Sequence, residues 1–205
     1  MSKKKEQSDD LDLSKFYVVS QQDLYISDFD SRDEWVLDVG GGGEGIIGML
    51  KGRNVIAIDS LKQELIETNN ESLKIVMDAK KLLFLDSTFS YVTAFFTFMY
   101  IPIDDFDTIF SELWRVMKPG GKFLVWEPIF AIPQQELSKR RAVIFLKIHF
   151  PDGKINETGY GGILRNQNLD SIVKPAQKIG FKVLDKKIND YYFFIKFQKP
   201  PLNIS

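Results

Sequence analysis

Short apolar runs and amphipathic stretches alternate along most of the chain. Five runs are rich in β-branched and aromatic residues, as buried strands are: residues 35–37, 54–58, 73–77, 89–98 and 122–126. Helical spacing of apolar residues separates several of these runs. Strands that alternate with helices indicate a parallel sheet covered on both faces, so we expect a doubly wound α/β fold.

Helices are predicted where apolar residues recur every three or four positions. This spacing gives helices over about 46–50, 61–71, 106–117 and 169–179. Residues 118–121, Lys-Pro-Gly-Gly, predict a turn that ends the third helix.

The end of the chain follows a different pattern. The runs 181–188 and 191–197 are separated only by Asn189 and Asp190. Two residues are too few for a crossover helix but enough for a hairpin. The sequence therefore predicts a mostly parallel, seven-stranded sheet that finishes with a C-terminal antiparallel hairpin.

The remaining segments do not follow this rhythm. Residues 1–12 are polar and charged and predict a mobile tail. We expect residues 13–205 to form a single domain, in which 13–34 are a short approach segment or flap. Residues 128–168 are expected to be an insertion on the substrate side.

Composition excludes several kinds of chemistry. The chain has no cysteine and one histidine, which excludes disulfides, thiolate nucleophiles and histidine-clustered metal centres, so no metal site is expected. No run of 18 apolar residues occurs. We therefore expect no membrane association and a cytoplasmic location.

Charge is unevenly distributed, although the net charge is only -1. Residues 1–121 hold 13 basic and 21 acidic residues, whereas 122–205 hold 14 and 7. The basic half slightly favours an anionic or polar small acceptor over a cationic one, although the lysine spacing after residue 174 is typical of solvated faces. No nucleic-acid-binding motif is present, so a nucleic-acid partner is not expected.

Five glycines occupy six positions directly after the first predicted strand: Gly40, Gly41, Gly42, Gly43 and Gly45. Glycine lets a backbone adopt positive φ and approach a ligand closely, so the cluster predicts a ligand-binding loop. A tight turn without a ligand is the alternative.

Acidic residues end the next two strands. Asp59 lies 19 residues after Gly40, where a carboxylate accepts hydrogen bonds from a ribose diol, and Ser60 follows it. A carboxylate at Asp78 can accept from an adenine amine while the Ala79 amide addresses a ring nitrogen. The alternatives are a helix cap at Asp59 and a solvated strand end at Asp78.

Asp38 bears on the kind of nucleotide. An acid two residues before the first glycine would repel a pyrophosphate, so it favours a ligand that carries positive charge.

The loop formed by Asp38, Val39 and Gly40 to Gly42 resembles the acid-x-Gly-x-Gly loop of class I S-adenosylmethionine-dependent methyltransferases of the type 11 kind. Asp59, Asp78-Ala79, the strand from Phe89 and the segment from Arg115 to Phe123 resemble later motifs of that family in order. The resemblance covers 35–127 closely and 168–198 only by pattern. It implies S-adenosylmethionine as cofactor, held by Asp38, Gly40, Gly42, Asp59, Ser60, Asp78, Ala79 and Phe95.

Three residues depart from the family pattern. Glu44 stands where the loop usually ends with glycine, so the loop is expected to be one residue longer. Ser90 replaces a common aspartate. Phe95 replaces a small or polar residue and would place a ring beside the methionine part of the cofactor.

Methyl transfer from a sulfonium is an in-line displacement that needs no nucleophile on the protein. Where the acceptor needs a base, the catalytic candidates are Tyr100 and Glu127, with His149 a third if the insertion folds back. The alternatives are a wall residue at Tyr100, an ion-paired strand end at Glu127 and a strand residue at His149.

Two other functions stay open. A non-catalytic S-adenosylmethionine-binding regulatory subunit would keep the same loop, and an NAD-dependent oxidoreductase would share the fold, although Asp38 argues against it. No motif identifies the methyl acceptor, expected to be a small molecule, or the oligomeric state.

Overall fold

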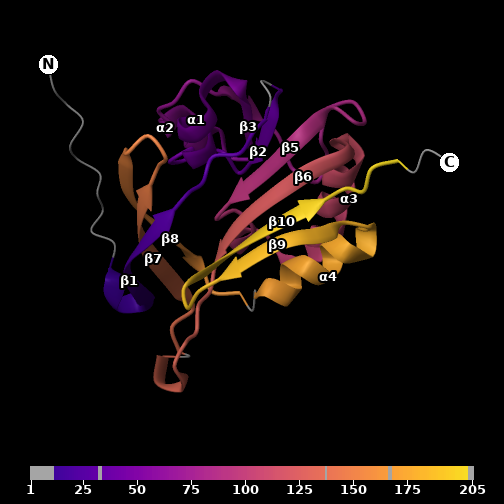
Figure 1. Cartoon of the computed structure of the whole chain (residues 1–205). Coiled ribbons are helices and arrows are strands. Elements are labelled where there is room, and N and C mark those ends of the chain that lie inside the picture. Colours follow the sequence, from indigo (N-terminus) through magenta and orange to yellow (C-terminus); the bar gives the residue numbers. More distant parts are fainter. Residues whose placement is uncertain (1–11, 32–33, 137, 166–167, 203–205) are drawn as a thin grey trace, which may run out of the picture.

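The structure is a computed structural model that describes residues 12–31, 34–136, 138–165 and 168–202. The tail predicted over residues 1–12 lies outside the described residues except for Asp12. Two sheets and the helices around them make up the described part of the chain (Figure 1).

The strands are β1 (Phe16–Tyr25), β2 (Val36–Val39), β3 (Val55–Asp59), β4 (Leu73–Val76), β5 (Phe89–Phe95), β6 (Met117–Pro128), β7 (Arg141–His149), β8 (Ile155–Ile163), β9 (Lys182–Ile188) and β10 (Tyr192–Gln198). The α-helices are α1 (Ile46–Lys51), α2 (Lys62–Glu67), α3 (Phe106–Val116) and α4 (Leu169–Ile179). The 3-10 turns are η1 (Leu13–Lys15), η2 (Gly52–Asn54), η3 (Phe98–Tyr100), η4 (Ile103–Asp105) and η5 (Gln134–Glu136).

The larger sheet has seven strands in the order β4-β3-β2-β5-β6-β10-β9. Neighbours among β4, β3, β2, β5 and β6 pair in parallel, while β10 pairs antiparallel with both β6 and β9. The predicted α/β fold and its terminal hairpin are therefore confirmed. The order reverses at β2, so the crevice for a ligand lies beyond the ends of β2 and β5.

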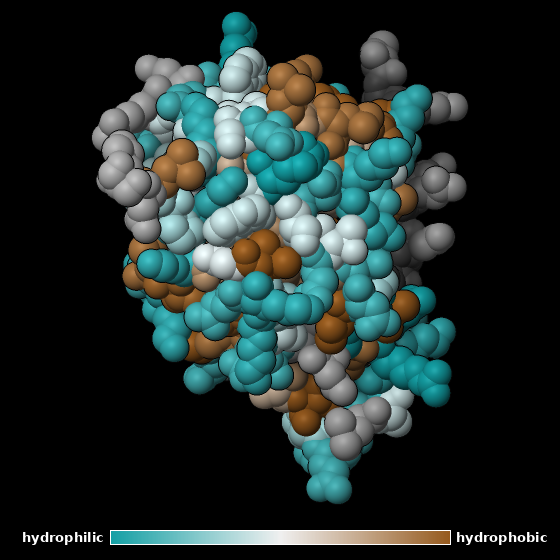
Figure 2. Space-filling model, turned by 90° about the vertical axis from the view of Figure 1, so that its right-hand side faces the viewer, coloured by the Kyte–Doolittle hydropathy of each residue, from teal (hydrophilic) through white to brown (hydrophobic). Residues whose placement is uncertain are grey.

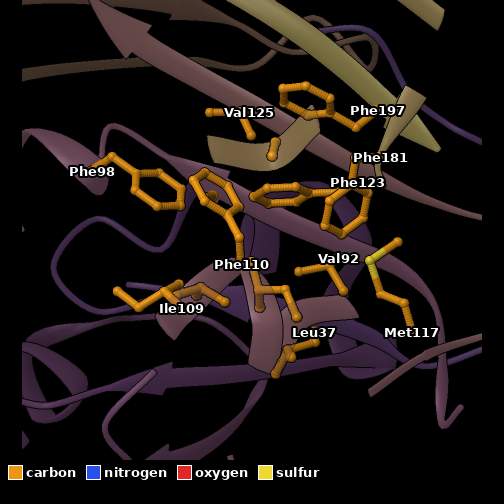
Figure 3. Close-up of a cluster of buried hydrophobic side chains, with 14 of the residues drawn as sticks. Leu37, Val92, Phe98, Ile109, Phe110, Met117, Phe123, Val125, Phe181 and Phe197 are labelled. Atoms are coloured by element: carbon orange, nitrogen blue, oxygen red, sulfur yellow. The ribbon is translucent and has the colours of Figure 1, made fainter. Parts of the chain in front are cut away.

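An aromatic core fills the face of this sheet that α3 and α4 cover (Figure 3). The rings of Phe98 and Phe110 stack at a centroid distance of 5.2 Å, and Phe110 meets Phe123 of β6 at 6.1 Å. These side chains are fully buried. This core fixes α3 and η3 relative to the ends of β5 and β6, which form part of the crevice.

The opposite face is covered by α1 and by a second, three-stranded sheet in the order β1-β7-β8. Ile144 and Leu146 of β7 are buried in the same cluster as Trp126 of the larger sheet. A small sheet therefore packs where a doubly wound fold usually places another helix.

The described residues of the segments 13–34 and 128–168, which we expected to be an approach segment and an insertion, include the three strands of the small sheet. β1 pairs in parallel with β7 over 16–25 and 141–149, and β7 pairs antiparallel with β8. Buried residues alternate with more exposed ones from Ile144 to His149, which is the period of a strand with one buried face. The sequence contained this signal, but we assigned the segment to an insertion.

The helix predicted over 61–71 was too long, because α2 ends at Glu67. Thr68 has extended dihedral angles, and its hydroxyl donates to the Glu64 carbonyl at 2.8 Å. Two residues later, the Asn70 amide donates to the Gly45 carbonyl at 2.9 Å. Side-chain bonds of this kind compete with helical ones, and here they tie the chain to the glycine loop.

Two strand boundaries also differ from the prediction. β5 ends at Phe95, because Phe96 adopts a φ of +50°, which strands do not accept. The turn predicted at 118–121 instead lies within β6, where Gly120 has a φ of +81° and donates its N–H to the Lys199 carbonyl.

Polar side chains cover most of the face beside α3 and α4, and hydrophobic ones form separate, smaller patches (Figure 2). Within the described residues, no helix is long and apolar enough to cross a membrane.

Candidate functional site

The glycine loop leaves β2 by a sharp turn. The N–H groups of Gly40 and Gly41 both donate to the Ile58 carbonyl, at 2.8 and 3.0 Å. Gly40 has a φ of +69°, and a Cβ there would lie 2.4 Å from Thr97 Cγ2. The turn therefore accepts no side chain at Gly40, even without a ligand.

The loop ends at Gly45, one position later than in the family pattern. Gly45 is left-handed, with a φ of +59°, and immediately precedes α1. A Cβ there would lie 2.4 Å from both Asn70 Nδ2 and Thr68 Cγ2. The extra residue, Glu44, is thus followed by a glycine that adopts the left-handed conformation and the close contacts found at the start of α1.

Asp38 lies beneath the loop and is only 2% exposed. Thr93 Oγ1 donates to its Oδ1 at 2.7 Å. Burial raises the pKa of Asp38 to about 7, the Thr93 hydrogen bond opposes the rise, and the Asp59 charge adds to it. A positively charged ligand would restore the ionised form, because an opposite charge nearby favours it.

Asp59 ends β3 and uses its two carboxylate oxygens differently. Oδ1 accepts the Leu61 N–H at 2.8 Å. This contact precedes α2 and is not the helix cap that we considered as an alternative, because Leu61 is the cap residue of α2. Oδ2 faces the glycine loop, since a Cβ at Gly42 would lie 2.8 Å from it. One oxygen therefore stabilises the approach to α2 while the other is directed toward the loop.

A cavity of about 840 Å³ lies above the ends of these strands. The predicted cofactor-binding residues that line it are Asp38, Gly40, Gly42, Asp59, Ser60, Asp78, Ala79 and Phe95. Tyr100 lines it as well, whereas Glu127 does not. Its volume is within the range of small-molecule sites.

Glu127 is held inside the protein. It is 2% exposed, and its Oε1 accepts the N–H groups of Thr97 and Phe98 at 2.8 and 2.6 Å. Its Oε2 accepts the Met99 N–H at 2.9 Å. Burial raises the pKa of Glu127 to about 8, against the three hydrogen bonds. These contacts favour a structural role in fixing η3 over the general-base role that we predicted.

Tyr100 is half-exposed, with 47% of its surface accessible. Burial of its polar end, followed by the charges of Glu44 and Glu127, raises the pKa of its hydroxyl. The hydroxyl therefore stays protonated at neutral pH. It can hydrogen-bond to an acceptor, but it is a poor source of a phenolate base.

His149, the third candidate, lies in the small sheet. Its ring stacks on Tyr25 at a centroid distance of 4.3 Å, and its Nε2 lies 2.6 Å from Asp23 Oδ1. The cavity lining does not include it. The alternative that we gave, a residue of a strand, describes its position.

The residues that the sequence analysis missed come from β8. Gly159, Tyr160 and Gly161 line the cavity from the side of the small sheet. The Thr158 hydroxyl donates to Glu44 Oε1, and the Tyr160 hydroxyl also hydrogen-bonds to Glu44. The sequence signal for this contact was Glu44, which departs from the family's loop pattern. A carboxylate within a glycine loop needs a hydrogen-bond partner, and β8 supplies one.

Acidic side chains dominate the cavity. Its lining includes seven carboxylates: Asp38, Glu44, Asp59, Glu64, Glu67, Asp78 and Asp105. Lys80 is the one basic side chain among the described lining residues, and it pairs with Asp105 at 3.1 Å. This lining argues against the anionic part of our expectation of an anionic or polar acceptor, which we drew from the charge of residues 122–205.

Residues 37–125 match the family model described as "Methyltransferase domain". This match and the fold support a relationship to the class I S-adenosylmethionine-dependent methyltransferases. The relationship implies S-adenosylmethionine as the cofactor. The residues present fit that molecule, since a buried carboxylate whose pKa is raised lies beneath a glycine loop, where a ligand ammonium would compensate it.

Curated relatives with this methyltransferase domain match part of the chain. A sterol 24-C-methyltransferase from Kluyveromyces lactis is 25% identical over 167 residues, which are 76% of this chain and 42% of that protein. A demethylmenaquinone methyltransferase from Bacillus mycoides is 33% identical over 97 residues, 46% of this chain and 40% of that protein. The chain spans less than half the length of these relatives.

Solved structures share the methyltransferase fold. An S-adenosylmethionine-dependent methyltransferase from Methanosarcina mazei superimposes with a TM-score of 0.63 at 17% identity, covering 85% of this chain and 95% of that one. The [4+2]-cyclase SpnF superimposes with a TM-score of 0.57 at 16% identity, covering 82% and 75%. The same fold thus occurs in a protein named for another reaction, so the reaction must be argued from the site.

Proposed function

We propose that this protein transfers the methyl group of S-adenosylmethionine to a small molecule that carries no negative charge. The observation that carries the proposal is Asp38, a buried carboxylate that lies under the glycine loop and is bonded by Thr93. A dinucleotide would bring a pyrophosphate to this loop, against Asp38 and the other carboxylates of the lining.

The cofactor contacts follow from the ends of the strands. Asp38 would hold the ligand ammonium, Oδ2 of Asp59 the ribose, and Asp78 with Ala79 the adenine. Gly40 and Gly42 keep the loop close to the ligand, and Ser60 and Phe95 complete the lining. The cofactor supplies a methyl group on a positively charged sulfur.

The protein's contribution to the reaction is positioning. Glu127 fixes η3 through three backbone N–H groups, and η3 ends at Tyr100. The Tyr100 hydroxyl, which remains protonated, would then lie at the acceptor side of the cavity. Holding the acceptor in line with the methyl group accounts for most of the rate acceleration that such a transfer needs.

The relatives support a small-molecule acceptor, because their names refer to sterols and demethylmenaquinone. The acidic lining supports one without negative charge. The same cavity would also suit a regulatory subunit that binds the cofactor without transferring the methyl group.

Calorimetry separates these functions. S-adenosylmethionine and S-adenosylhomocysteine should bind with micromolar affinity, and NAD should not bind measurably. Micromolar binding of NAD without binding of S-adenosylmethionine would overturn the proposal. Transfer of labelled methyl from S-adenosylmethionine into a small-molecule extract distinguishes an enzyme from a regulatory subunit, which would bind the cofactor and label nothing.

A further inference from the structure

Part of the cavity remains without a role once the cofactor residues are assigned. Its walls are Phe96, Tyr100 and Tyr160, next to Phe95 of the cofactor side, and Glu44 lies at their edge. We propose that these residues select an amine as the methyl acceptor, with Glu44 stabilising the positive charge that arrives on its nitrogen. This inference rests on the proposed methyl transfer and names the substrate class for it.

The aromatic side chains form a continuous wall. The ring of Tyr160 lies 4.9 Å from that of Phe96 and 5.9 Å from that of Phe95, measured between centroids. Tyr160 is only 8% exposed. The faces of such rings attract cations, and a desolvated setting strengthens that attraction.

Phe96 shows that this wall is held at a conformational cost. Its φ is +50°, although it is a large residue for which positive φ is unfavourable. Its N–H donates to the Trp126 carbonyl at 2.8 Å, which keeps the ring beside Tyr160. Strain that persists beside a cavity indicates that the side chain is needed in this position.

Glu44 is the carboxylate directed at this wall. Thr158 and Tyr160 both hydrogen-bond to it, so two residues of β8 orient it over the loop. An ionised carboxylate offers about four acceptor positions, so capacity for a ligand N–H remains. The Glu44 charge also reaches Tyr100 and Glu64, because it contributes to raising the pKa of each.

Negative charge is unfavourable throughout this region. Burial raises the pKa of Glu64, with Asp59 the next contributor, and burial also raises the pKa of Tyr160 well above its ordinary value. Burial disfavours any charge there, but the repulsion of Glu64 by Asp59 and of the Tyr160 phenolate by Glu44 acts specifically against a further anion. A carboxylate or phosphate on the acceptor would meet the same resistance, whereas an amine would relieve it.

The charge balance of the reaction fits an amine. The nitrogen lone pair of the free amine forms the new bond to the methyl carbon while the bond from sulfur to that carbon breaks. The electron pair of the broken bond stays on sulfur, which becomes a neutral thioether. Positive charge thus passes from sulfur to nitrogen, which leaves as a methylated ammonium. The proton of an ammonium substrate is released to solvent before the transfer, so that the free amine is the nucleophile.

The test uses three probes of matched shape: 2-phenylethylamine, 2-phenylethanol and 3-phenylpropionate. Calorimetry measures their binding to the full chain saturated with S-adenosylhomocysteine. An ammonium beside this thioether reproduces the charge distribution after transfer. We expect the amine to bind at least about tenfold more tightly than the alcohol, as expected for a cation at a desolvated aromatic site, and the carboxylate to bind most weakly.

Two variants locate the effect. Glu44→Gln keeps an acceptor for Thr158 but removes the charge, and it should reduce the preference for the amine over the alcohol about tenfold. Glu157→Gln is the matched control. Glu157 lies on β8 next to Thr158, the partner of Glu44, and pairs with Lys147 outside the cavity. That variant should leave the preference unchanged.

Three results would overturn the inference: equal binding of amine and alcohol, tightest binding of the carboxylate, or no binding of the amine at millimolar concentration. An unchanged preference for the amine over the alcohol in Glu44→Gln would show that Glu44 does not contribute to the selection. These outcomes are distinct from failure of the proposed function, because each leaves the binding of S-adenosylhomocysteine in the first titration intact.

Discussion

The Thr93 hydroxyl donates to the Asp38 carboxylate at 2.7 Å across the neighbouring strands β5 and β2. This bond opposes only part of the burial that raises the pKa of Asp38 to about 7. The ionised form of Asp38 thus becomes available near neutral pH, where a positively charged ligand selects it.

Cofactor binding should therefore depend on pH. A ligand ammonium favours ionised Asp38, so below about pH 7 binding must first remove a proton from this residue. We expect the affinity for S-adenosylmethionine to fall by up to about tenfold per pH unit below 7 and to level off above it. Calorimetry from pH 5.5 to 8.5 measures this, and Asp38→Asn should bind weakly with no such slope. An equally steep slope in Asp38→Asn would assign the proton to another group.

Asp59 allows its two roles to be separated. Asp59→Asn keeps an oxygen to accept the Leu61 N–H, but its amide cannot replace both carboxylate oxygens. We expect thermal stability close to that of the wild type and cofactor affinity about tenfold lower or worse, as for loss of charge-assisted hydrogen bonds. Asp59→Ala should lose both properties. Unchanged cofactor affinity in Asp59→Asn would leave Asp59 with a structural role alone, through its contact with the Leu61 N–H.

Glu127 should matter for stability. In Glu127→Gln an amide nitrogen replaces Oε2 and faces the Met99 N–H, so a buried donor loses its acceptor. We expect a loss of about 1–3 kcal/mol in the free energy of unfolding, measured by urea denaturation. The exposed Glu71→Gln, which disrupts a surface pair with Arg53, should cost less than about 0.5 kcal/mol.

The pH dependence of stability gives a second measure of Glu127. Its pKa is raised to about 8 in the folded protein, against an ordinary 4.5, so the folded state binds the extra proton between these values. This contribution is fully present below about pH 4.5 and is lost as pH rises through 8. Stability of the ligand-free wild type should therefore fall from pH 6 to pH 9, and the fall should be smaller in Glu127→Gln.

Gly40 tests the geometry of the loop. Gly40→Ala must adopt a φ of +69° and place its Cβ 2.4 Å from Thr97 Cγ2. Gly153→Ala also requires a positive φ, +85°, but no atom lies within 4 Å of its Cβ. We expect about 1 kcal/mol of destabilisation in Gly153→Ala and more than about 3 kcal/mol in Gly40→Ala. Adding Thr97→Ala to Gly40→Ala should recover part of that difference, and no recovery would point to another cause.

Tyr100 belongs to the acceptor side in our proposal. Tyr100→Phe removes a hydroxyl that no cofactor-binding residue contacts, so cofactor affinity should stay within about 1 kcal/mol. Turnover should fall once an acceptor is known. Loss of cofactor binding with the fold intact would place the acceptor on the opposite side.

The central strands β2, β3, β5 and β6 of the larger sheet were predictable because most of their residues are buried on both faces. Such strands appear in the sequence as continuous apolar runs. The run 54–58 starts and ends one residue before β3, and the run 122–126 lies inside β6. The acidic residues that line the cavity were predictable for a related reason. Asp38, Asp59 and Asp78 each directly follow or end such a run, and parallel strands bring these ends to one edge of the sheet.

The acceptor side was not predictable from local patterns. The partners of Glu44 lie 114 residues away in sequence, at Thr158 and beyond. No periodicity connects positions so far apart, and the glycines of β8 suggested a loop. The contacts of Glu127 were not predictable because its partners are backbone N–H groups, which every sequence contains and which no motif reports.

The parallel pairing of β1 with β7 has a consequence for how the chain acquires its structure. Phe16 aligns with Arg141, and Tyr25 aligns with His149. During synthesis from the N-terminus, β1 cannot pair until more than a hundred further residues have been added and β7, its partner, has been synthesised. Contacts of such long sequence separation form slowly, so the small sheet should assemble last. The part of the cavity wall that β8 contributes should therefore form only after the larger sheet is complete.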